Sequence, residues 1–364
     1  MKRLLIFHAT IPSYRIDLFN KLTDFFCVKL IAYGEKNNIS KLGFDYKQVA
    51  QEARFEYKVY DRGIYLGNNH LLSTMYYHEI KKFKPDIVFC QELGVNTLAA
   101  IALKKLFRYK IFINCDDSPD MLLHYSKKRE WLRKYVFNRI DGVLVVHTEV
   151  ERKLNVIFPQ CRFLYFPIIQ DENRFQEKLD ASKDFADNYR NKFGLDHQTV
   201  FLFVGRLVEE KQPMMLLQAF KKADIPHSKL IIVGSGPLSD QIKKYVQDNQ
   251  LENRVLLTGK LQGNELYAWY RIADYFVLPS KFEPFGAVVN EALMSGCKVF
   301  VSDKVGANTL VSVHNGVIFN STNRNELIDI LKSSLQKKKS IENLTPISFK
   351  DLILKLNSFF YNDN

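Results

Sequence analysis

Residues 278–296 read LPSKFEPFGAVVNEALMSG, and this stretch carries the clearest information about fold and chemistry in the sequence. Its first residues end an apolar strand, and Pro284 and Gly286 open a helix directly after the following loop. Strand, loop and helix in this order are typical of an α/β protein with a parallel sheet. In such sheets ligands bind at the carboxyl ends of the strands, so the loop around Phe285 is where we look for a site.

Two acids in this stretch, Glu283 and Glu291, are separated by seven residues. A helical span of eight residues rises about 12 Å, farther than the roughly 5–9.5 Å between the two carboxylates of a glycosidase. The spacing instead suits hydroxyl groups at opposite ends of one ligand, with a phosphate over the helix N-terminus between them. A nucleotide sugar has that shape. The alternative is that Glu283 complements the helix dipole and that Glu291 is a solvated surface residue. The apolar neighbours of Glu291 weaken this alternative, because an unpaired carboxylate buried among them would be costly.

Two cations follow an earlier strand, in the stretch FLFVGRL at residues 201–207. The strand ends at Gly205-Arg206, and Lys211 comes five residues later. Arg206 can grip a phosphate bidentately and Lys211 adds a point charge, so the pair can neutralise a departing diphosphate. The alternative is a pair of exposed loop cations.

Glycines end two further strands, in VGSGP at residues 233–237 and LTGKL at residues 257–261. At Gly234 and Gly259 the backbone can approach a ligand closely. The first of these turns lacks the third glycine of a dinucleotide fingerprint, so the signal is weak by itself.

The whole chain of 364 residues exceeds the size of most single cores, so we expect two α/β domains. The first covers residues 1–169, the second residues 170–345, and residues 346–364 form a C-terminal helix that can pack back on the first. In the first domain apolar runs predict strands at 4–7, 28–32, 87–90, 110–114, 142–146 and 163–166, and helices over 15–26, 71–82, 95–107 and 126–139.

A charged stretch over residues 170–196 is interpreted as a linker and entry helix. The alternation of strands and helices then restarts, and predicts strands at 200–204, 230–233, 255–258, 275–278 and 299–302 with helices at 212–222, 237–249, 263–271, 287–295, 325–335 and 353–360. Two Rossmann-like domains with parallel sheets that face one another across a cleft are therefore predicted.

Composition narrows the class of protein. Hydrophobic residues make up 46% and charged residues 25% of the chain, as in soluble globular proteins, and no apolar run reaches the roughly 20 residues of a membrane span. Five scattered cysteines are expected to be reduced, in a cytoplasmic protein. The net charge of +12 suits phosphates, anionic lipid or nucleic acid, or else reflects compositional drift.

Together these motifs resemble, over residues 200–318, the donor-binding domain of the family 4 retaining glycosyltransferases. VGRLVEEKQP, IIVGSGP, LTGKL, PSKFEPFGAVVNEALMSG and the later Gly306 with His314-Asn315-Gly316 occur in the family's order. The resemblance implies a GT-B fold and a UDP- or GDP-sugar donor. It also implies that Arg206 and Lys211 hold the diphosphate, Glu283 contacts the sugar, Glu291 binds the ribose, and the base lies against Gly259, Lys260 and Leu261.

The N-terminal half resembles the family less closely, because HATIPSYR at residues 8–15 stands where members often carry a Gly-Gly loop. Asp116 and Asp117 follow a predicted strand and are candidates to orient an acceptor hydroxyl or take its proton, as is Glu92. Capping of a helix N-terminus is the alternative role for the Asp pair.

No Asp-x-Asp triplet occurs, so we expect no metal and no cofactor. A basic stretch at 124–139 with Trp131 and Tyr135 at helical spacing either rests on an anionic membrane or packs on its own sheet. The predicted function is transfer of a sugar to a glycan or lipid-linked acceptor, in surface polysaccharide synthesis, at the inner face of the plasma membrane. The alternatives are a nucleotide-sugar epimerase, a phosphorylase, or a basic nucleic-acid-binding protein; nucleic acid is not an expected partner.

Overall fold

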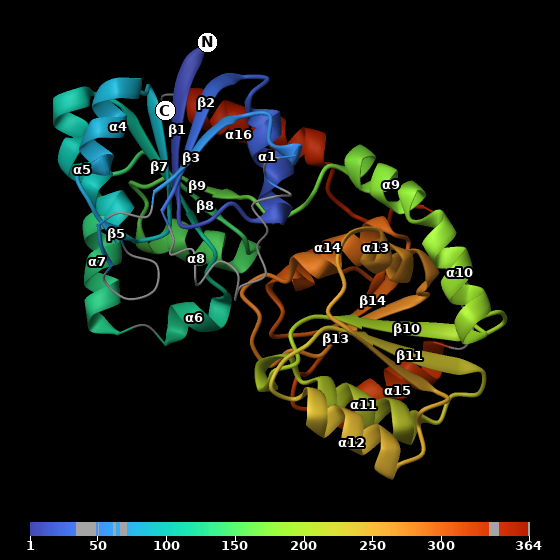
Figure 1. Cartoon of the computed structure of the whole chain (residues 1–364). Helices are drawn as coiled ribbons and strands as arrows, with labels where there is room; N and C mark the ends of the chain where they lie inside the picture. Colours follow the sequence, from blue (N-terminus) through green and yellow to red (C-terminus); the bar gives the residue numbers. More distant parts are fainter. Residues whose placement is uncertain are drawn as a thin grey trace. The chain divides into compact units, whose positions relative to one another are not determined.

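The structure is a computed structural model that describes residues 1–33, 49, 51–60, 63–65, 71–124, 126–334 and 342–362. The chain divides into two compact units (Figure 1). Unit 1 contains Met1–Ile168 and Phe349–Asn364, and unit 2 contains Ile169–Ser348. The C-terminal helix therefore belongs to the same unit as the N-terminal strand.

Unit 1 is built around a seven-stranded sheet of order β3-β2-β1-β6-β7-β8-β9, in which every neighbouring pair is parallel. Its strands are β1 (Lys2–His8), β2 (Phe26–Ala32), β3 (Glu56–Val59), β6 (Ile87–Gln91), β7 (Lys110–Cys115), β8 (Gly142–Val145) and β9 (Phe163–Tyr165), with a small hairpin of β4 (Ile64–Tyr65) and β5 (Leu71–Leu72). Its helices are η1 (Ser13–Arg15), α1 (Ile16–Leu22), α4 (Met75–Phe83), α5 (Val95–Phe107), α6 (Pro119–Leu123), α7 (Lys127–Phe137), α8 (Thr148–Ile157) and α16 (Phe349–Tyr361).

Unit 2 has a six-stranded parallel sheet of order β12-β11-β10-β13-β14-β15. Its strands are β10 (Thr199–Val204), β11 (Ser228–Val233), β12 (Val255–Gly259), β13 (Tyr275–Leu278), β14 (Lys298–Ser302) and β15 (Gly316–Phe319). Its helices are α9 (Glu172–Ala181), α10 (Lys183–Phe193), η2 (Glu209–Lys211), α11 (Pro213–Ala223), α12 (Ser239–Asp248), α13 (Gly263–Ile272), α14 (Ala287–Met294), η3 (Gly306–Leu310) and α15 (Arg324–Ser333).

The central strands of both sheets are buried along nearly their whole length, because helices cover both faces of each sheet (Figure 1). This explains why they appear in the sequence as continuous apolar runs. The predicted class, α/β with two Rossmann-like domains and parallel sheets, is confirmed.

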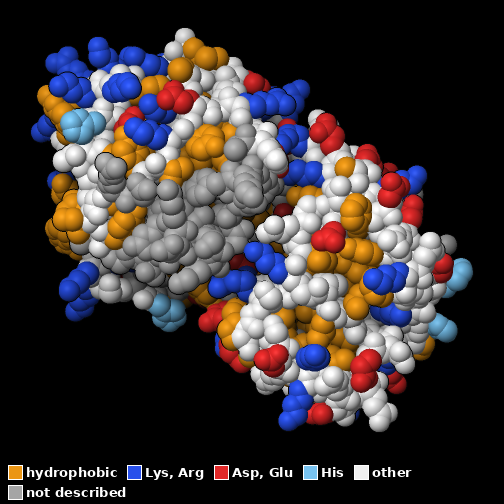
Figure 2. Space-filling model, viewed as in Figure 1, with side chains coloured by type: hydrophobic (Ala, Val, Ile, Leu, Met, Phe, Trp, Pro, Cys, Tyr) orange, Lys and Arg blue, Asp and Glu red, His pale blue; other side chains and the backbone are white. Residues whose placement is uncertain are grey.

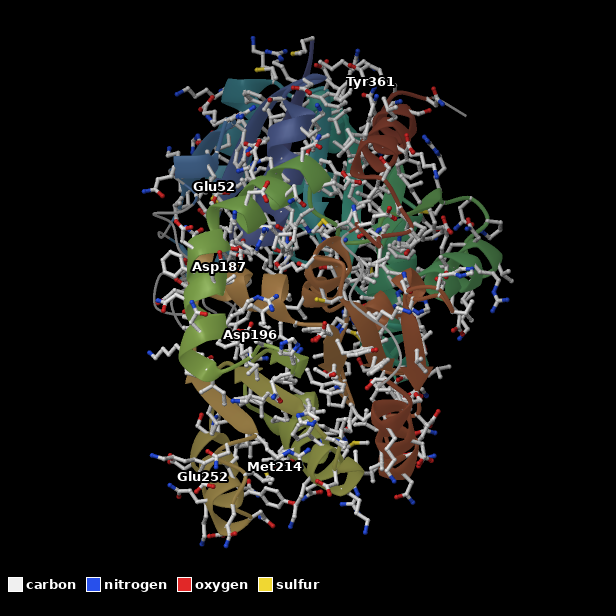
Figure 3. The ribbon with its side chains drawn as sticks, turned by 90° about the vertical axis from the view of Figure 1, so that its right-hand side faces the viewer. Glu52, Asp187, Asp196, Met214, Glu252 and Tyr361 are labelled. Carbon is white, nitrogen blue, oxygen red and sulfur yellow. The ribbon has the colours of Figure 1, made fainter. Side chains whose placement is uncertain are left out.

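The stretch interpreted as a linker and entry helix holds two helices, α9 and α10, that pack on α13. The Phe175 ring meets Tyr267 edge to face at 5.6 Å, and Tyr189 stacks on the buried Trp269 at 4.8 Å. Few apolar residues make these contacts, and α10 exposes Asp187 with Asp196 beyond its end (Figure 3). The sparse apolar pattern therefore concealed elements that are part of the unit 2 core.

The helix predicted over residues 71–82 is wrong at its start. Leu71 and Leu72 form β5, and α4 begins only at Met75. The Ser73 hydroxyl accepts a hydrogen bond from the Met75 amide at 3.2 Å, which turns the chain between the two elements.

The C-terminal helix α16 packs on the unit 1 sheet through Phe360, whose ring contacts Phe112 at 4.6 Å, Phe89 at 5.8 Å and Phe26 at 6.0 Å. Arg162 donates to the carbonyls of Phe359 and Asn362, so carbonyls at the end of the helix are satisfied by a side chain next to the sheet.

Lys and Arg side chains gather over α4 and α5 on the visible face of the molecule (Figure 2). Both helices carry lysines in the last turn, as does α11, where positive charge complements the helix dipole. Part of the charge of +12 therefore stabilises helix ends.

Candidate active site

The unit 2 sheet changes winding direction between β10 and β13, which is where ligands bind in parallel α/β sheets. Arg206 and Lys211 follow β10, and Glu283 follows β13. The Lys211 ammonium contacts the Glu283 carboxylate, with 16% and 13% of the two side chains exposed. The Glu210 carbonyl also accepts from the Lys281 amide at 2.9 Å, so the two loops are joined. The structure thus brings predicted site residues from the two motifs together.

Burial and the nearby positive charge of Arg206 lower the pKa of Lys211 to about 8, whereas Glu210 opposes the shift. Arg206 itself is exposed. A mostly buried ammonium and an exposed guanidinium at one sheet edge form a site that an anionic group would stabilise.

The loop after β10 packs against the glycines of the loop that follows β11. Gly205 and Leu207 donate to the carbonyls of Val233 and Ser235, both at 3.0 Å. A Cβ on Gly234, which has φ +148°, would lie 1.8 Å from the Gly205 carbonyl oxygen. The close approach that the sequence predicted at Gly234 is therefore explained by protein backbone, which fixes the loop that carries Arg206.

The loop of Pro284, Phe285 and Gly286 ends in a left-handed residue, Gly286 with φ 94°, before α14 begins at Ala287. Gly306 packs directly against this loop: a Cβ on Gly306 would lie 2.0 Å from the Pro284 carbonyl oxygen, so no larger residue fits there. The Gly306 amide donates to the Glu283 carbonyl at 3.0 Å. These contacts fix the backbone position of Glu283.

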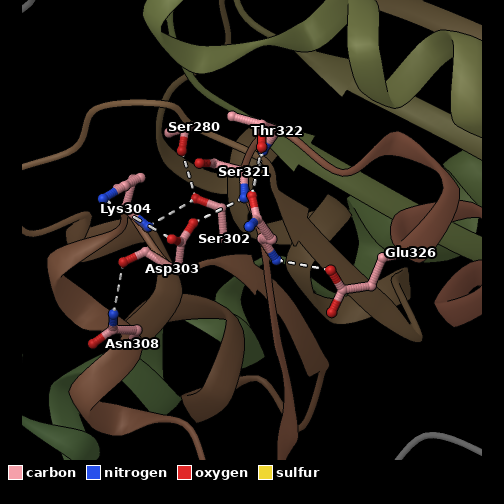
Figure 4. A network of polar contacts seen from close by, with 9 residues as sticks. Ser280, Ser302, Asp303, Lys304, Asn308, Ser321, Thr322 and Glu326 are labelled. Atoms are coloured by element: carbon pink, nitrogen blue, oxygen red, sulfur yellow. Dashed lines mark hydrogen bonds and ion pairs between the residues drawn. The ribbon is translucent and has the colours of Figure 1, made fainter.

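A polar network holds the segment that carries Gly306 (Figure 4). The Ser302 hydroxyl donates to the Ser280 carbonyl, and the Asp303 carboxylate accepts from the Ser321 amide at 2.8 Å. Asn308 donates to the Asp303 carbonyl at 3.2 Å. The ends of β13, β14 and β15 are thereby tied into one edge.

Glu291, on α14, has different partners from Glu283. Its Oε2 accepts from the Tyr270 hydroxyl and its Oε1 from the Gln170 amide, both at 2.8 Å. Burial raises the pKa of this carboxyl, and these hydrogen bonds oppose the shift. Glu291 is therefore partnered rather than solvated. Neither Gln170 nor Tyr270 was predicted from the sequence, because no spacing to either motif signals them.

Gly259, Lys260 and Leu261 lie at the end of β12, on the same edge, where the Gly259 carbonyl accepts from the Gly234 amide at 2.9 Å. Lys260 is exposed. The strand order places them two strands from β10.

The corresponding edge of unit 1 carries acids. Arg15 and Asp116 form an ion pair at 3.1 Å, although they are 101 residues apart. Asp117 is 2% exposed and pairs with Arg133 at 3.2 Å. Neither Asp caps a helix, so that alternative is wrong: the Ser118 hydroxyl accepts from the Met121 amide at the start of α6.

Glu92 follows β6, at the winding change of unit 1, and has an unusual φ of 51°. Burial and the negative charges of Asp116 and Asp117 raise its pKa to about 7. Tyr14 lies in the same cluster, and burial with Asp116 raises its pKa to about 12. Perturbed acids at a sheet edge are typical of functional sites.

Within the part of the chain that the structure describes, no group of three His, Cys, Asp or Glu side chains is arranged to hold a metal ion. None of the five cysteines forms a disulfide with another. Of the helices among the described residues, none is long and apolar enough to cross a membrane.

Residues 185–350 match the family model "Glycosyl transferases group 1". Two curated relatives are the sulfoquinovosyl transferase SQD2 of Arabidopsis thaliana, 24% identical over 74% of this chain and 54% of its own, and a Campylobacter jejuni enzyme, 33% identical over 50% and 46%. The latter is an N-acetylgalactosamine-N,N'-diacetylbacillosaminyl-diphospho-undecaprenol 4-alpha-N-acetylgalactosaminyltransferase. The chain spans 36% to 57% of the length of the curated relatives it matches first.

Among solved structures, Anabaena HepE in complex with UDP has a TM-score of 0.72 with 17% identity, and the match covers 100% of this chain and 96% of HepE. At this identity the likeness concerns the fold, which is that of the GT-B glycosyltransferases. The chain therefore has the GT-B fold, and residues 185–350 match the glycosyl transferases group 1 family.

Proposed function

We propose that this chain transfers a sugar from a nucleotide-sugar donor to a glycan or lipid-linked acceptor, with retention of configuration and without a bound metal. The contact between Lys211 and Glu283 at the winding change of unit 2 carries the proposal. It puts a cation for phosphate beside an acid for sugar hydroxyls, at the edge where such sheets bind ligands.

On the donor side, Arg206 and Lys211 bind the diphosphate and stabilise the charge that it gains as the bond to the sugar carbon breaks. Bound phosphate also restores the Lys211 proton, which burial and Arg206 disfavour. Glu283 orients the sugar, Glu291 accepts from the ribose hydroxyls, and Gly259, Lys260 and Leu261 lie against the base. The relative solved with UDP supports a uridine donor.

On the acceptor side, we assign the reacting hydroxyl to the acidic edge of unit 1. Its oxygen forms the new bond to the sugar carbon, and its proton must leave. Glu92, whose pKa is raised to about 7, suits the acceptance of that proton, and we assign to Asp116, which pairs with Arg15, the orientation of the acceptor. Asp117 is buried among arginines and is suited to holding the edge together.

A lipid-linked acceptor and a role in surface polysaccharide synthesis are supported by the Campylobacter jejuni relative, whose name specifies an undecaprenol-linked substrate. Helix α7 exposes 68% of Trp131, whose ring stacks on Tyr135, and Lys127, Lys128 and Lys134 are exposed on the same helix. Such a helix suits an anionic membrane surface, as at the cytoplasmic leaflet.

Two experiments test the proposal. The protein is incubated with UDP- and GDP-sugars, with or without undecaprenol-linked saccharides, and products are identified by mass spectrometry and their anomeric configuration by NMR. New glycan only when acceptor is present supports transfer. A changed donor in the absence of acceptor would indicate an epimerase. Formation of a sugar phosphate from glycan and phosphate would indicate a phosphorylase.

Activity is expected to survive EDTA. Loss of activity in EDTA that is recovered with manganese would contradict metal independence.

The membrane part is tested by sedimentation with anionic vesicles at low salt. The wild type should sediment, and Trp131→Ala should bind more weakly. An absence of binding to these vesicles would refute the membrane part and leave the transferase proposal intact.

A further inference from the structure

Helix α14 is connected to both places where the chain passes between the two units. The first passage lies between Ile168 and Ile169, and the second between Ser348 and Phe349. Each passage is bordered, on the unit 2 side, by residues that hydrogen-bond to α14. All of these hydrogen bonds lie within unit 2.

Gln170 is the second residue of unit 2 after the first passage, and it is 4% exposed. Its amide donates to Asn290 Oδ1 at 3.0 Å, and its side chain donates to Glu291 Oε1 at 2.8 Å. Backbone and side chain of this one residue therefore hold two consecutive residues of α14.

Thr345 and Leu344 precede the second passage by a few residues. Asn290 Nδ2 donates to Thr345 Oγ1 at 3.4 Å, and the Leu344 amide donates to the Leu293 carbonyl at 2.9 Å. The Asn290 side chain is thus shared: its oxygen holds the first segment and its nitrogen the second.

The burial of Asn290 makes the loss of either of its partners costly. It is 1% exposed, and a buried amide that loses a partner keeps its full desolvation cost. Moving the first segment away from α14 therefore breaks a buried hydrogen bond at Asn290 and removes a donor from Glu291, and moving the second breaks a part-buried hydrogen bond of the same side chain.

Glu291 connects this arrangement to the ligand. Each carboxylate oxygen offers about two acceptor positions, of which Gln170 and Tyr270 fill one apiece. The remaining positions fix where hydroxyl donors can bind, so the orientation of the carboxylate depends on Gln170.

We propose that Gln170 and Asn290 form a hinge clamp that couples binding of a nucleoside's vicinal hydroxyls at Glu291 to the conformation of both chain segments that lead into unit 1. The inference rests on the proposed function, because it takes Glu291 as the ribose ligand. Coupling between two sites is reciprocal, so a bound nucleotide stabilises the clamp and the clamp strengthens nucleotide binding by the same factor.

Hydrogen exchange measured by mass spectrometry with UDP as the probe, and with GDP in parallel, tests the coupling. In the wild type, the nucleotide that binds should slow exchange in α14, at residues 168–171 and at residues 343–346. Thr345→Val removes only the second contact, so protection at 343–346 should fall while protection at 168–171 stays. Asn290→Leu should lose both. Asn249→Leu, at the end of α12, is the matched control and should behave as the wild type.

A second readout isolates the positioning role. Gln170→Leu should weaken binding of the nucleotide roughly tenfold or more, the scale of a lost hydrogen bond to a charged group. Binding of the 2′,3′-dideoxy nucleotide, which lacks the hydroxyls, should change little. Equal loss for both nucleotides would mean a merely structural role and would overturn the positioning part.

Nucleotide protection of α14 with neither segment protected, or with Thr345→Val and Asn290→Leu both indistinguishable from wild type, would overturn the clamp while donor binding stands. If neither nucleotide protects α14 in the wild type, the proposed function fails first and the clamp with it.

Discussion

In both sheets the winding direction changes beside the first strand, at β1 and β6 in unit 1 and at β10 and β13 in unit 2, but the carboxyl edges carry different chemistry. In unit 2 the edge presents two cations, Arg206 and Lys211, and the Glu283 carboxylate contacts Lys211. In unit 1 the edge presents Glu92, Asp116 and Asp117, the two aspartates each paired with arginine. One fold can therefore carry a cationic edge in one unit and an acidic edge in the other, because the chemistry of an edge depends on the side chains that it carries.

The edges also differ in how their residues are held. In unit 2, close packing of loop backbone against glycines fixes the loops, as at Gly234 and Gly306. In unit 1, buried ion pairs such as Asp117 with Arg133 do so. Substitutions at each edge can therefore separate residues that hold an edge from residues that act on a ligand.

The largest effect is expected from Asp117→Ala, which leaves the buried Arg133 without this carboxylate. Breaking a buried ion pair costs about 3–5 kcal/mol, so the free energy of unfolding in urea should fall by that amount. The exposed pair of Lys21 and Asp24 gives the control: Asp24→Ala should cost at most about 1 kcal/mol. Equal costs would show that Asp117 does not hold the unit 1 edge.

Arg206→Ala and Lys211→Ala should each lower kcat about 10²–10³-fold, because each removes a donor to the charge that develops on the diphosphate. Initial rates at saturating donor measure this. Lys222→Ala, an exposed lysine at the end of α11, should retain the wild-type rate. A loss below tenfold in both site variants would remove these cations from the chemistry.

Gly234→Ala should destabilise the protein by about 1–3 kcal/mol through overpacking, with further strain from the positive φ. Gly194→Ala is the matched control, since Gly194 has φ +57° but a Cβ added there would meet nothing within 4 Å, and about 1 kcal/mol is expected. Thermal unfolding of the two variants compares them. If the two variants lose the same free energy of unfolding, the close contact with the Gly205 backbone is not the reason why a glycine is required at position 234.

The smallest effect is the pH dependence of kcat/KM, which reports the free enzyme. The pKa of Lys211 is lowered to about 8, so its charge is lost as the pH rises through that value and the rate should fall. The pKa of Glu92 is raised to about 7, so it is protonated, and inactive as a base, as the pH falls below that value. Each limb should change the rate about tenfold per pH unit beyond its pKa. Glu92→Gln should abolish the acid limb alone; an unchanged acid limb would exclude Glu92.

Much of the fold was predictable because buried parallel strands appear as apolar runs and the crossover helices separate them. The grouping of Arg206, Lys211 and Glu283 at the carboxyl edge of unit 2 was predictable in outline, because they lie within short, ordered motifs next to strand ends. Only one entry helix was predicted where α9 and α10 lie, because only a few aromatic residues such as Phe175 and Tyr189 pack on unit 2.

The partners of Glu291 and Asp116 were not predictable. Gln170 lies 121 residues from Glu291, and Arg15 lies 101 residues from Asp116, so folding alone brings them together. Asp116 and Asp117 are adjacent in sequence, yet one faces Arg15 and the other Arg133; only the structure separates a candidate for acceptor binding from a buried structural acid.

Calorimetric titration of a panel of nucleotide sugars into the wild type, Arg206→Ala and Glu291→Ala tests the central claim most directly. One nucleotide sugar should bind the wild type, with the affinity reduced at least tenfold in each variant, since each loses a charged hydrogen-bonding partner of the donor. Unchanged affinity in both variants, or no binding by any nucleotide sugar, would contradict a donor site at the carboxyl edge of unit 2.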